Sequence, residues 1–193
     1  MARILCLEGI TGTGKTTQAN LLSRYFNLNC VSHLIFNDKH YEPFKQAVID
    51  WHNAGANQNF SREDILVFAK ARVDSHKKNL IPIMNSLTYL IFDRSVYTSG
   101  VYESDGGLEL NEIVELNLRE GVIKPEGGVV LLCSPEVART RIDERRMKTN
   151  YKLPSMHESV SEITKRRERY IELARQHPEL YLIDTTSKSE EDV

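Results

Sequence analysis

Short apolar runs alternate along the chain with longer segments of mixed polarity, and glycine, proline or capping residues separate them. Apolar runs of this length are typical of buried strands. They predict strands at Ile4–Leu7, Cys30–Phe36, Tyr89–Phe92, Gly128–Leu132 and Tyr181–Ile183. The segments between them predict helices at Lys15–Phe26, Glu42–Asn53, Arg62–Asn85, Leu110–Glu120, Pro135–Arg146 and Ser155–Gln176. Strands that alternate with helices form a parallel sheet covered on both faces, so we expect a three-layer α/β fold with five strands.

The composition narrows the class of protein. A chain of 193 residues fits one domain, residues 1–193, and its 25 Lys and Arg against 27 Asp and Glu lack the basic excess of a nonspecific nucleic-acid binder. The apolar start of the chain is too short for a signal peptide, and no run of about 18 apolar residues could span a bilayer. Cys6, Cys30 and Cys133 are odd in number and predict reduced core residues. We therefore expect a cytoplasmic protein with neither a nucleic-acid nor a membrane partner.

A complete phosphate-binding loop of the form G-x-x-x-x-G-K-[ST] lies between the first predicted strand and the first predicted helix. Its glycines let successive backbone N–H groups point inward and form an anion cradle at the helix N-terminus. Lys15 adds a positive charge on the β- and γ-phosphates, and the Thr16 hydroxyl can bind Mg²⁺. An accidental glycine-rich turn would not need this context, so the sequence predicts a site for a nucleoside triphosphate. The loop residues are Gly9, Ile10, Thr11, Gly12, Thr13, Gly14, Lys15 and Thr16, followed by Thr17.

The predicted strand Tyr89–Phe92 is followed directly by an acid and a base, Asp93 and Arg94. Ligands of an open parallel sheet bind beyond the carboxyl ends of its strands, so both side chains should lie beside the phosphate loop. The carboxylate can hold Mg²⁺ or take a proton from the attacking group, and the guanidinium can grip a phosphate. Considered alone, the pair could also be a solvated turn.

Basic residues crowd the span from Ser134 to Lys152, in which Pro135 opens a predicted helix. Such density is unfavourable unless the cations face a polyanion or stay solvated. Arg141 and Arg145 are four residues apart and share a helical face, so one could stack on adenine while the other reaches the transferred phosphate. An ordinary solvated helix is the alternative. The cluster comprises Arg139, Arg141, Arg145, Arg146, Lys148 and Lys152.

These motifs, in this order and spacing, resemble thymidylate kinases, the nucleoside monophosphate kinases that phosphorylate dTMP. The resemblance covers nearly the whole chain and implies the fold of P-loop kinases. Its matching pieces are Leu7–Ala19, Phe68–Arg72, Ile81-Pro82, Asp93–Thr98 with Tyr102, Pro135–Ala138 with the arginines after it, Tyr170–Ala174 and Ile183-Asp184.

The resemblance also implies roles for individual residues at the acceptor nucleotide. Phe68 corresponds to the aromatic ring that stacks on the base, and Arg72 to the group that contacts its carbonyl edge. From the residues alone, this pair could equally be a core phenylalanine beneath a surface arginine. Tyr102 corresponds to a ring beneath the sugar that excludes a ribose 2′-hydroxyl, and Thr98 would lie near the base.

For catalysis, the resemblance implies that Arg94 clamps the acceptor phosphate and Asp93 organises Mg²⁺ or the acceptor oxygen. Family members without a basic residue in the middle of the phosphate loop usually supply one from a lid. Here the lid, at about residues 145–155, carries Arg145 and Arg146. We therefore expect ATP as donor, dTMP as acceptor, Mg²⁺ as cofactor and a homodimer.

The chain departs from the family pattern at two places. Thr11 stands where the family usually has an acid, and Phe36–His40 replaces a stretch that usually reads Arg-Glu-Pro-Gly-Gly. In the family, both segments contact the acceptor nucleotide. The string that begins at Asp93 also resembles deoxynucleoside kinases, in which Asp38 or Glu42 would be the base that activates a nucleoside hydroxyl. A third possibility is a non-catalytic protein that only binds ATP.

Overall fold

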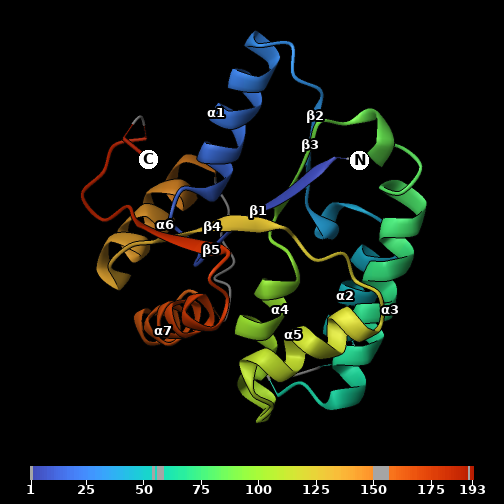
Figure 1. The fold of residues 1–193 in the computed structure, drawn as a ribbon. Coiled ribbons are helices and arrows are strands. Elements are labelled where there is room, and N and C mark those ends of the chain that lie inside the picture. The colour runs from blue at the N-terminus through green and yellow to red at the C-terminus, as the bar shows by residue number, and fades with distance from the viewer. Residues whose placement is uncertain (1, 54, 56–58, 150–156, 191) are drawn as a thin grey trace.

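A parallel sheet of five strands forms the middle of the molecule in the computed structural model, which describes every residue except 1, 54, 56–58, 150–156 and 191. The strand order is β2-β3-β1-β4-β5, which confirms the predicted parallel α/β fold (Figure 1). The strands are β1 (Arg3–Gly9), β2 (His33–Phe36), β3 (Tyr89–Asp93), β4 (Gly127–Leu132) and β5 (Leu180–Asp184).

The register of the central strands brings the chemical motifs together. In β1, Leu7 pairs with Asp93 of β3, and Gly9 pairs with Leu131 of β4. All strands run in the same direction, so the ends of β1 and β3 meet at one edge of the sheet. The phosphate loop and the Asp93-Arg94 pair therefore leave the sheet side by side.

Seven α-helices surround the sheet in the described part of the chain. They are α1 (Lys15–Leu28), α2 (Phe44–Asn53), α3 (Arg62–Asn79), α4 (Val96–Glu103), α5 (Leu110–Arg119), α6 (Pro135–Thr149) and α7 (Val160–Gln176). Short 3₁₀ turns lie at η1 (Asp38–His40), η2 (Met84–Ser86) and η3 (Ser104–Gly106). No helix among the described residues is both long and apolar enough to cross a membrane.

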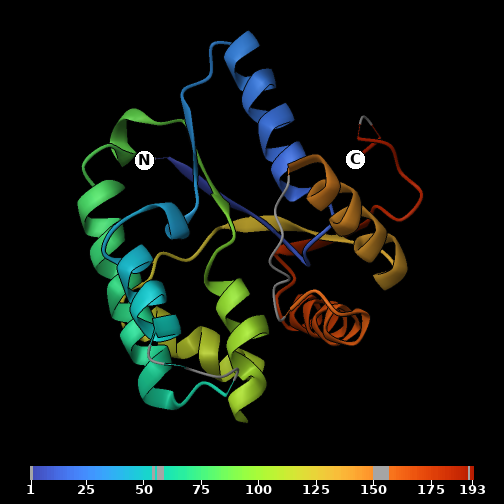
Figure 2. The same cartoon turned by 180° about the vertical axis from the view of Figure 1, so that it is seen from behind.

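Residues that alternate along the strands build two apolar layers of unequal size. Cys6, Phe92 and Val130 face the larger core, whereas Leu7 and Ile91 face a smaller core that α1 completes. Figures 1 and 2 show α1 on one side of the sheet and α4, α5 and α7 on the other. This arrangement is the three-layer architecture.

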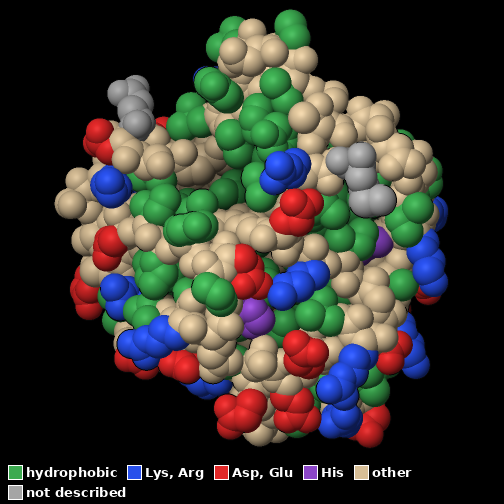
Figure 3. All heavy atoms as spheres, in the orientation of Figure 1, with side chains coloured by type: hydrophobic (Ala, Val, Ile, Leu, Met, Phe, Trp, Pro, Cys, Tyr) green, Lys and Arg blue, Asp and Glu red, His purple; other side chains and the backbone are tan. Residues whose placement is uncertain are grey.

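The smaller layer leaves apolar side chains at the surface. Tyr25 and Leu28 of α1 and Tyr181 of the edge strand β5 are exposed there, whereas Leu182, which pairs with Val130 of the larger core, is exposed on the opposite face. Figure 3 shows apolar side chains gathered over these two elements.

Several boundaries differ from the sequence predictions. Helix α3 ends at Asn79 and not at Asn85, because Pro82 cannot continue a helix. Strand β2 begins at His33, since Cys30 has a left-handed backbone with φ 54°. Cys30 is also exposed, so its expected place in the core is wrong.

Helix α4 was not predicted at all. Its sequence is rich in valine, tyrosine and glycine, which are weak helix formers. A capping residue nonetheless starts it, because the Ser95 side chain accepts a hydrogen bond from the backbone N–H of Tyr97. The predicted start of the last helix, Ser155, lies outside the described residues.

Candidate active site

The phosphate loop curls tightly against β4 and α6. Gly9 and Gly12 both have positive φ, at 132° and 88°. A Cβ atom on Gly9 would lie 2.1 Å from the Leu131 carbonyl oxygen, and one on Gly12 would lie 2.6 Å from that of Ala138. Only glycine fits at either position, so these packing contacts fix the path of the loop.

The Lys15 side chain is buried inside this loop. Its Nζ donates hydrogen bonds to the carbonyl oxygens of Gly9 (2.8 Å) and Ile10 (2.6 Å) and lies 3.5 Å from Thr13 Oγ1. Burial, and then repulsion from Arg94, lower the pKa of Lys15 well below its usual value. Thr16, the next residue, is exposed at the start of α1. The loop therefore carries its ammonium inside the cradle and an accessible hydroxyl beside it.

Asp93 and Arg94 lie beside the loop, as the sequence predicts. The Arg94 backbone is left-handed, with φ 75°, and its N–H donates to the Leu7 carbonyl oxygen at 3.0 Å. Its guanidinium Nη1 lies 3.4 Å from the Gly9 carbonyl oxygen. Asp93 Oδ2 accepts a hydrogen bond of 3.3 Å from the Asn37 amide, which comes from the end of β2. Strand ends β1, β2 and β3 thus converge on one carboxylate and one guanidinium.

A fully buried carboxylate, Glu8, supports this arrangement, and the sequence interpretation gave it no role. It accepts hydrogen bonds from Ser95 N (2.6 Å) and Oγ (2.7 Å), from Thr98 Oγ1 (2.6 Å) and from Tyr170 OH (2.9 Å). Burial and the Glu8 charge raise the pKa of Tyr170. An acid inside an apolar strand was the signal for such a centre, because a buried charge needs several partners. The hydroxyl of Thr98 belongs to this network, and its role near a base stays a prediction.

The ring of Tyr102 lies between two guanidinium groups. The Cζ atoms of Arg94 and Arg166 are 5.3 Å and 4.8 Å from the ring centroid. The His157 ring stands edge-on to it at 5.4 Å, and Arg166 lies 2.8 Å from His157 Nδ1. Burial and the Arg166 charge lower the pKa of His157 to about 4, so this ring is neutral at pH 7. The Tyr102 ring therefore contacts two cations, one of them the Arg94 expected to bind phosphate.

Phe68 and Arg72 are both buried in helix α3. Phe68 belongs to an aromatic cluster with Phe44, Trp51 and Phe60, at centroid distances of 6.0, 6.0 and 5.9 Å. Because Arg72 is only 5% exposed, the alternative of a surface arginine is wrong.

The partners of Arg72 come from elements far apart in the sequence. Its Nε donates to Asp38 Oδ2 at 3.0 Å, and its Nη1 donates to Ser99 Oγ at 2.8 Å and to Asn117 Oδ1 at 3.0 Å. Neither Ser99 nor Asn117 belongs to a motif, and no signal in the sequence pointed to them.

Lys39, in the segment Phe36–His40 that departs from the family pattern, is a further cation near Asp93 and Arg94. Lys39 interacts electrostatically with Arg94, Asp93 and Arg72. Partial burial, and then the Arg94 charge, lower the pKa of Lys39 to about 8. Asn37 holds this residue in place, since its side chain accepts from the Lys39 N–H at 3.1 Å.

On the donor side, Arg141 connects the phosphate loop to the segment after β5. Its Nη2 donates to the Thr185 carbonyl oxygen at 2.9 Å, and its Nη1 lies 3.5 Å from the Gly12 carbonyl oxygen. The Thr185 hydroxyl contacts the Thr13 carbonyl oxygen at 3.3 Å. Thr185 was not predicted, although its place directly after a parallel strand was a usable signal.

Arg145 and Arg146 lie at the end of α6 and contact Glu158. Arg145 is 3.7 Å from this carboxylate and well exposed, whereas Arg146 forms a close ion pair with it. Together with Thr149 they line a cavity of about 290 Å³. Lys152 and the rest of the expected lid fall in 150–156, outside the described residues.

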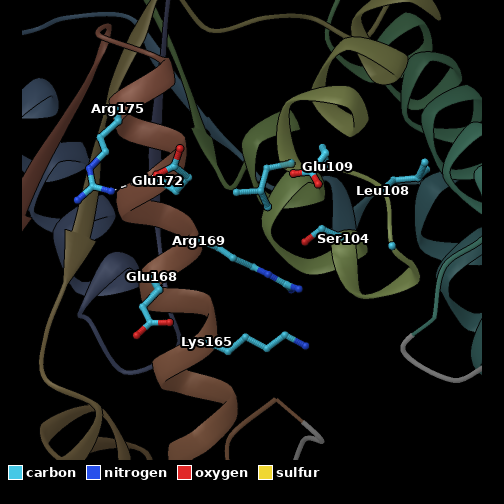
Figure 4. Close-up of a pocket in the computed structure, with 10 residues that line it drawn as sticks. Ser104, Leu108, Glu109, Lys165, Glu168, Arg169, Glu172 and Arg175 are labelled. Carbon is cyan, nitrogen blue, oxygen red and sulfur yellow. Dashed lines mark hydrogen bonds and ion pairs between the residues drawn. The ribbon is translucent and has the colours of Figure 1, made fainter.

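Another pocket, of about 540 Å³, lies between α7 and the segment that leads into α5 (Figure 4). Arg169 and Lys165 point from α7 toward that segment, and Glu168, Glu172 and Arg175 lie along the same helix. Cations and carboxylates are mixed here, and none of the predicted site residues lines the pocket. We therefore take the phosphate loop, and not this pocket, as the candidate active site.

The comparisons with known proteins agree with this geometry. The family model described as thymidylate kinase matches residues 7–193. The thymidylate kinase of Symbiobacterium thermophilum is 28% identical over 197 residues, covering 100% of this chain and 89% of its own. The probable thymidylate kinases of Thermococcus gammatolerans and Pyrococcus horikoshii are each 28% identical over 99% and 97% of this chain and 92% and 90% of their own. The chain belongs to the thymidylate kinase family and is thus a nucleoside monophosphate kinase, a phosphotransferase.

Proposed function

We propose that the protein transfers the γ-phosphate of ATP to dTMP in the presence of Mg²⁺ and releases ADP and dTDP. The observation that carries this proposal is that Lys15 Nζ and Arg94 Nη1 lie 2.8 and 3.4 Å from the same carbonyl oxygen, that of Gly9, while Lys39 interacts with both Arg94 and Asp93. Cations this close repel one another, and the phosphate groups of two nucleotides would neutralise them. The site is thus suited to phosphoryl transfer between two anions.

The phosphate loop would hold the donor. Its backbone N–H groups and Lys15 would bind the β- and γ-phosphates at the N-terminus of α1. The Arg141 guanidinium, fixed on Thr185, would stack on the adenine. Ile10, Thr11, Thr13 and Thr17 complete the expected donor contacts.

Thr16 and Asp93 fit a magnesium site. Thr16 is exposed at the helix start, and Asp93 Oδ2 is oriented by Asn37. Hydroxyl and carboxylate oxygens are ligands that Mg²⁺ prefers, together with water and phosphate oxygens. When bound, the ion would neutralise charge on the donor phosphates.

Arg94 and Lys39 would bind the acceptor phosphate next to the loop. One of its oxygens would bond to the γ-phosphorus of ATP while the bond from that phosphorus to the bridging oxygen of ADP breaks. Asp93 would orient this oxygen and take a proton where one is present. Arg145 and Arg146 would turn from Glu158 toward the transferred group, where their charge stabilises the transition state.

The acceptor base and sugar would lie between Arg72 and Tyr102. A guanidinium offers donors only, so it favours thymine, which has a carbonyl at the edge where cytosine has an amino group. Tyr102 beneath the sugar would crowd a 2′-hydroxyl. The ring of Phe68 would line the base pocket, with Thr98 near its entrance.

A deoxynucleoside kinase remains the second candidate because of the string at Asp93. Such an enzyme needs a carboxylate that is available as a base. Asp38 is buried and bonded to Arg72 and His76, and Glu42 accepts from the Gln46 N–H at 3.0 Å. Because both carboxylates already accept hydrogen bonds from protein groups, neither is well placed to act as the base, which favours the monophosphate kinase.

Measurement of ADP release with dTMP, dUMP, UMP, CMP and thymidine tests the proposal. We expect the highest kcat/KM with dTMP. Turnover with thymidine and with no monophosphate would establish the deoxynucleoside kinase instead, and no turnover with any acceptor would leave a binding-only protein. We also propose a homodimer, as the family resemblance implies, which light scattering after size-exclusion chromatography would test.

A further inference from the structure

Arg72 is fixed by a set of acceptors that leaves few of its donors available. A guanidinium has five N–H groups. Asp38 takes the one on Nε, and Ser99 and Asn117 take those on Nη1. Among the described residues, only Nη2 has no hydrogen bond to the protein.

Asp38 is the only charged member of this set, and it is as buried as Arg72. The two side chains are each 6% exposed. Its second oxygen, Oδ1, lies 3.0 Å from His76 Nε2. A carboxylate only accepts hydrogen bonds, so His76 Nε2 carries the proton, and Asp38 is itself held from both sides. The guanidinium also lies 4.6 Å from the centroid of the Phe44 ring, which limits its tilt.

The position of Asp38 follows from the short turn η1 directly after β2. Asn37 caps this turn through Lys39 and donates to Asp93. One segment therefore orients the carboxylate at the reaction centre and the carboxylate that holds Arg72. This segment replaces the Arg-Glu-Pro-Gly-Gly stretch of the family.

We infer that Asp38 is the positioning residue for acceptor-base selection, because it holds Arg72 so that only the Nη2 edge is left for the base. The inference rests on the proposed function. The Nη2 group of Arg72 has two N–H donors and no acceptor, so it can bond to a carbonyl oxygen of the base. Where the base carries an amino group instead, two donors face each other and no hydrogen bond forms. Asp38 thus selects thymine and uracil over cytosine without touching the base.

The variant Asp38→Asn tests this role with little change in shape. An asparagine keeps the volume but lacks the charge and has one accepting oxygen in place of two, so it holds Arg72 and His76 less firmly. Misplacing a substrate-positioning group costs up to about 100-fold, so we expect kcat/KM for dTMP to fall by about that factor. The value for dCMP should fall much less, which narrows the preference for dTMP by at least about tenfold. The KM for ATP should stay unchanged.

Two further variants make the result specific. Asp38→Glu keeps the charge and should recover part of the preference. Asp74→Asn is the control, because it removes an exposed carboxylate of α3, the helix of Arg72. The Asp74 side chain is 63% exposed and lies 3.8 Å from Lys77, so the variant should leave all kinetic constants unchanged.

The ratio of kcat/KM for dTMP to kcat/KM for dCMP distinguishes a positioning role of Asp38 from a merely structural one. A structural role would lower both rates and the melting temperature together and leave the ratio intact, and that result would overturn the inference while the proposed function stands. If Asp38→Asn does not fold, the same ratio is measured in Asp38→Ser, which also removes the carboxylate, and a wild-type ratio there overturns the inference. If the wild type turns over no pyrimidine monophosphate, the proposed function fails and the inference fails with it.

Discussion

The ends of the site proposed for the donor and for the acceptor differ in the groups that form them. The donor end is mostly backbone, in which Gly9 and Gly12 approach neighbouring carbonyl groups too closely for any side chain. The acceptor end is mostly buried side chains, with Arg72 bonded to residues from η1, α4 and α5. A backbone site needs a contiguous motif, whereas a side-chain site is assembled from distant residues.

This difference explains where the chain follows its family and where it departs. The loop cannot vary without losing its shape, and it matches the motif at every defined position. The acceptor end can exchange one set of charged side chains for another. Here Asp38 and Lys39 occupy the segment that departs. The predictions below test the donor end first and then the acceptor end.

Replacing Lys15 with alanine should have the largest effect. Loss of one transition-state donor of this kind costs about 10²–10³ in rate. We expect a folded protein with kcat reduced by that factor, measured by ADP release. Lys78→Ala, at an exposed lysine of α3, is the control, and substantial turnover by Lys15→Ala would contradict a catalytic role for the loop lysine.

Arg94→Ala tests the junction between the two ends. The change removes the guanidinium beside both phosphates, so the acceptor KM should rise and kcat should fall, together about 10²-fold in kcat/KM. Calorimetric titration should show nearly normal ATP binding. Arg24→Ala on the exposed face of α1 serves as control, and an unchanged affinity for the acceptor would refute the assignment.

The charge of Lys39 should give acceptor binding a dependence on pH. Its pKa is lowered to about 8, so the ammonium is present below pH 8 and is lost as the pH rises through that value. The acceptor phosphate is already a dianion above about pH 6, so its KM should rise about tenfold between pH 7 and 9. In Lys39→Met the KM should be high and flat across this range, while Lys45→Met on the exposed side of α2 should behave as wild type.

Tyr102→Ala should have the smallest effect, on sugar choice. Without the ring, the preference for dTMP over UMP should shrink by less than about tenfold, because a pocket rejects an added hydroxyl only weakly. Tyr102→Phe keeps the ring between Arg94 and Arg166 and should keep the preference. A preference unaffected by alanine would place the sugar elsewhere.

The contrast between the two ends also governs what the sequence could predict. Strands and the phosphate loop are local patterns, so their existence and their succession along the chain were predicted correctly. Helix α4 was missed because its residues favour strands and turns, and one serine cap overrides them. Burial of Arg72 could not be predicted, because a long charged side chain is buried only when distant partners meet it. Glu8 could have been identified from an acid in an apolar strand.

The most direct test follows the transferred phosphate itself. ATP with heavy-oxygen labels on its γ-phosphate should be incubated with dTMP and the intact protein, and the products separated and analysed by mass spectrometry. We predict that the label appears in the terminal phosphate of dTDP, with ADP formed in equal amount. Label found only in free inorganic phosphate, or transferred to thymidine but never to dTMP, would contradict the account.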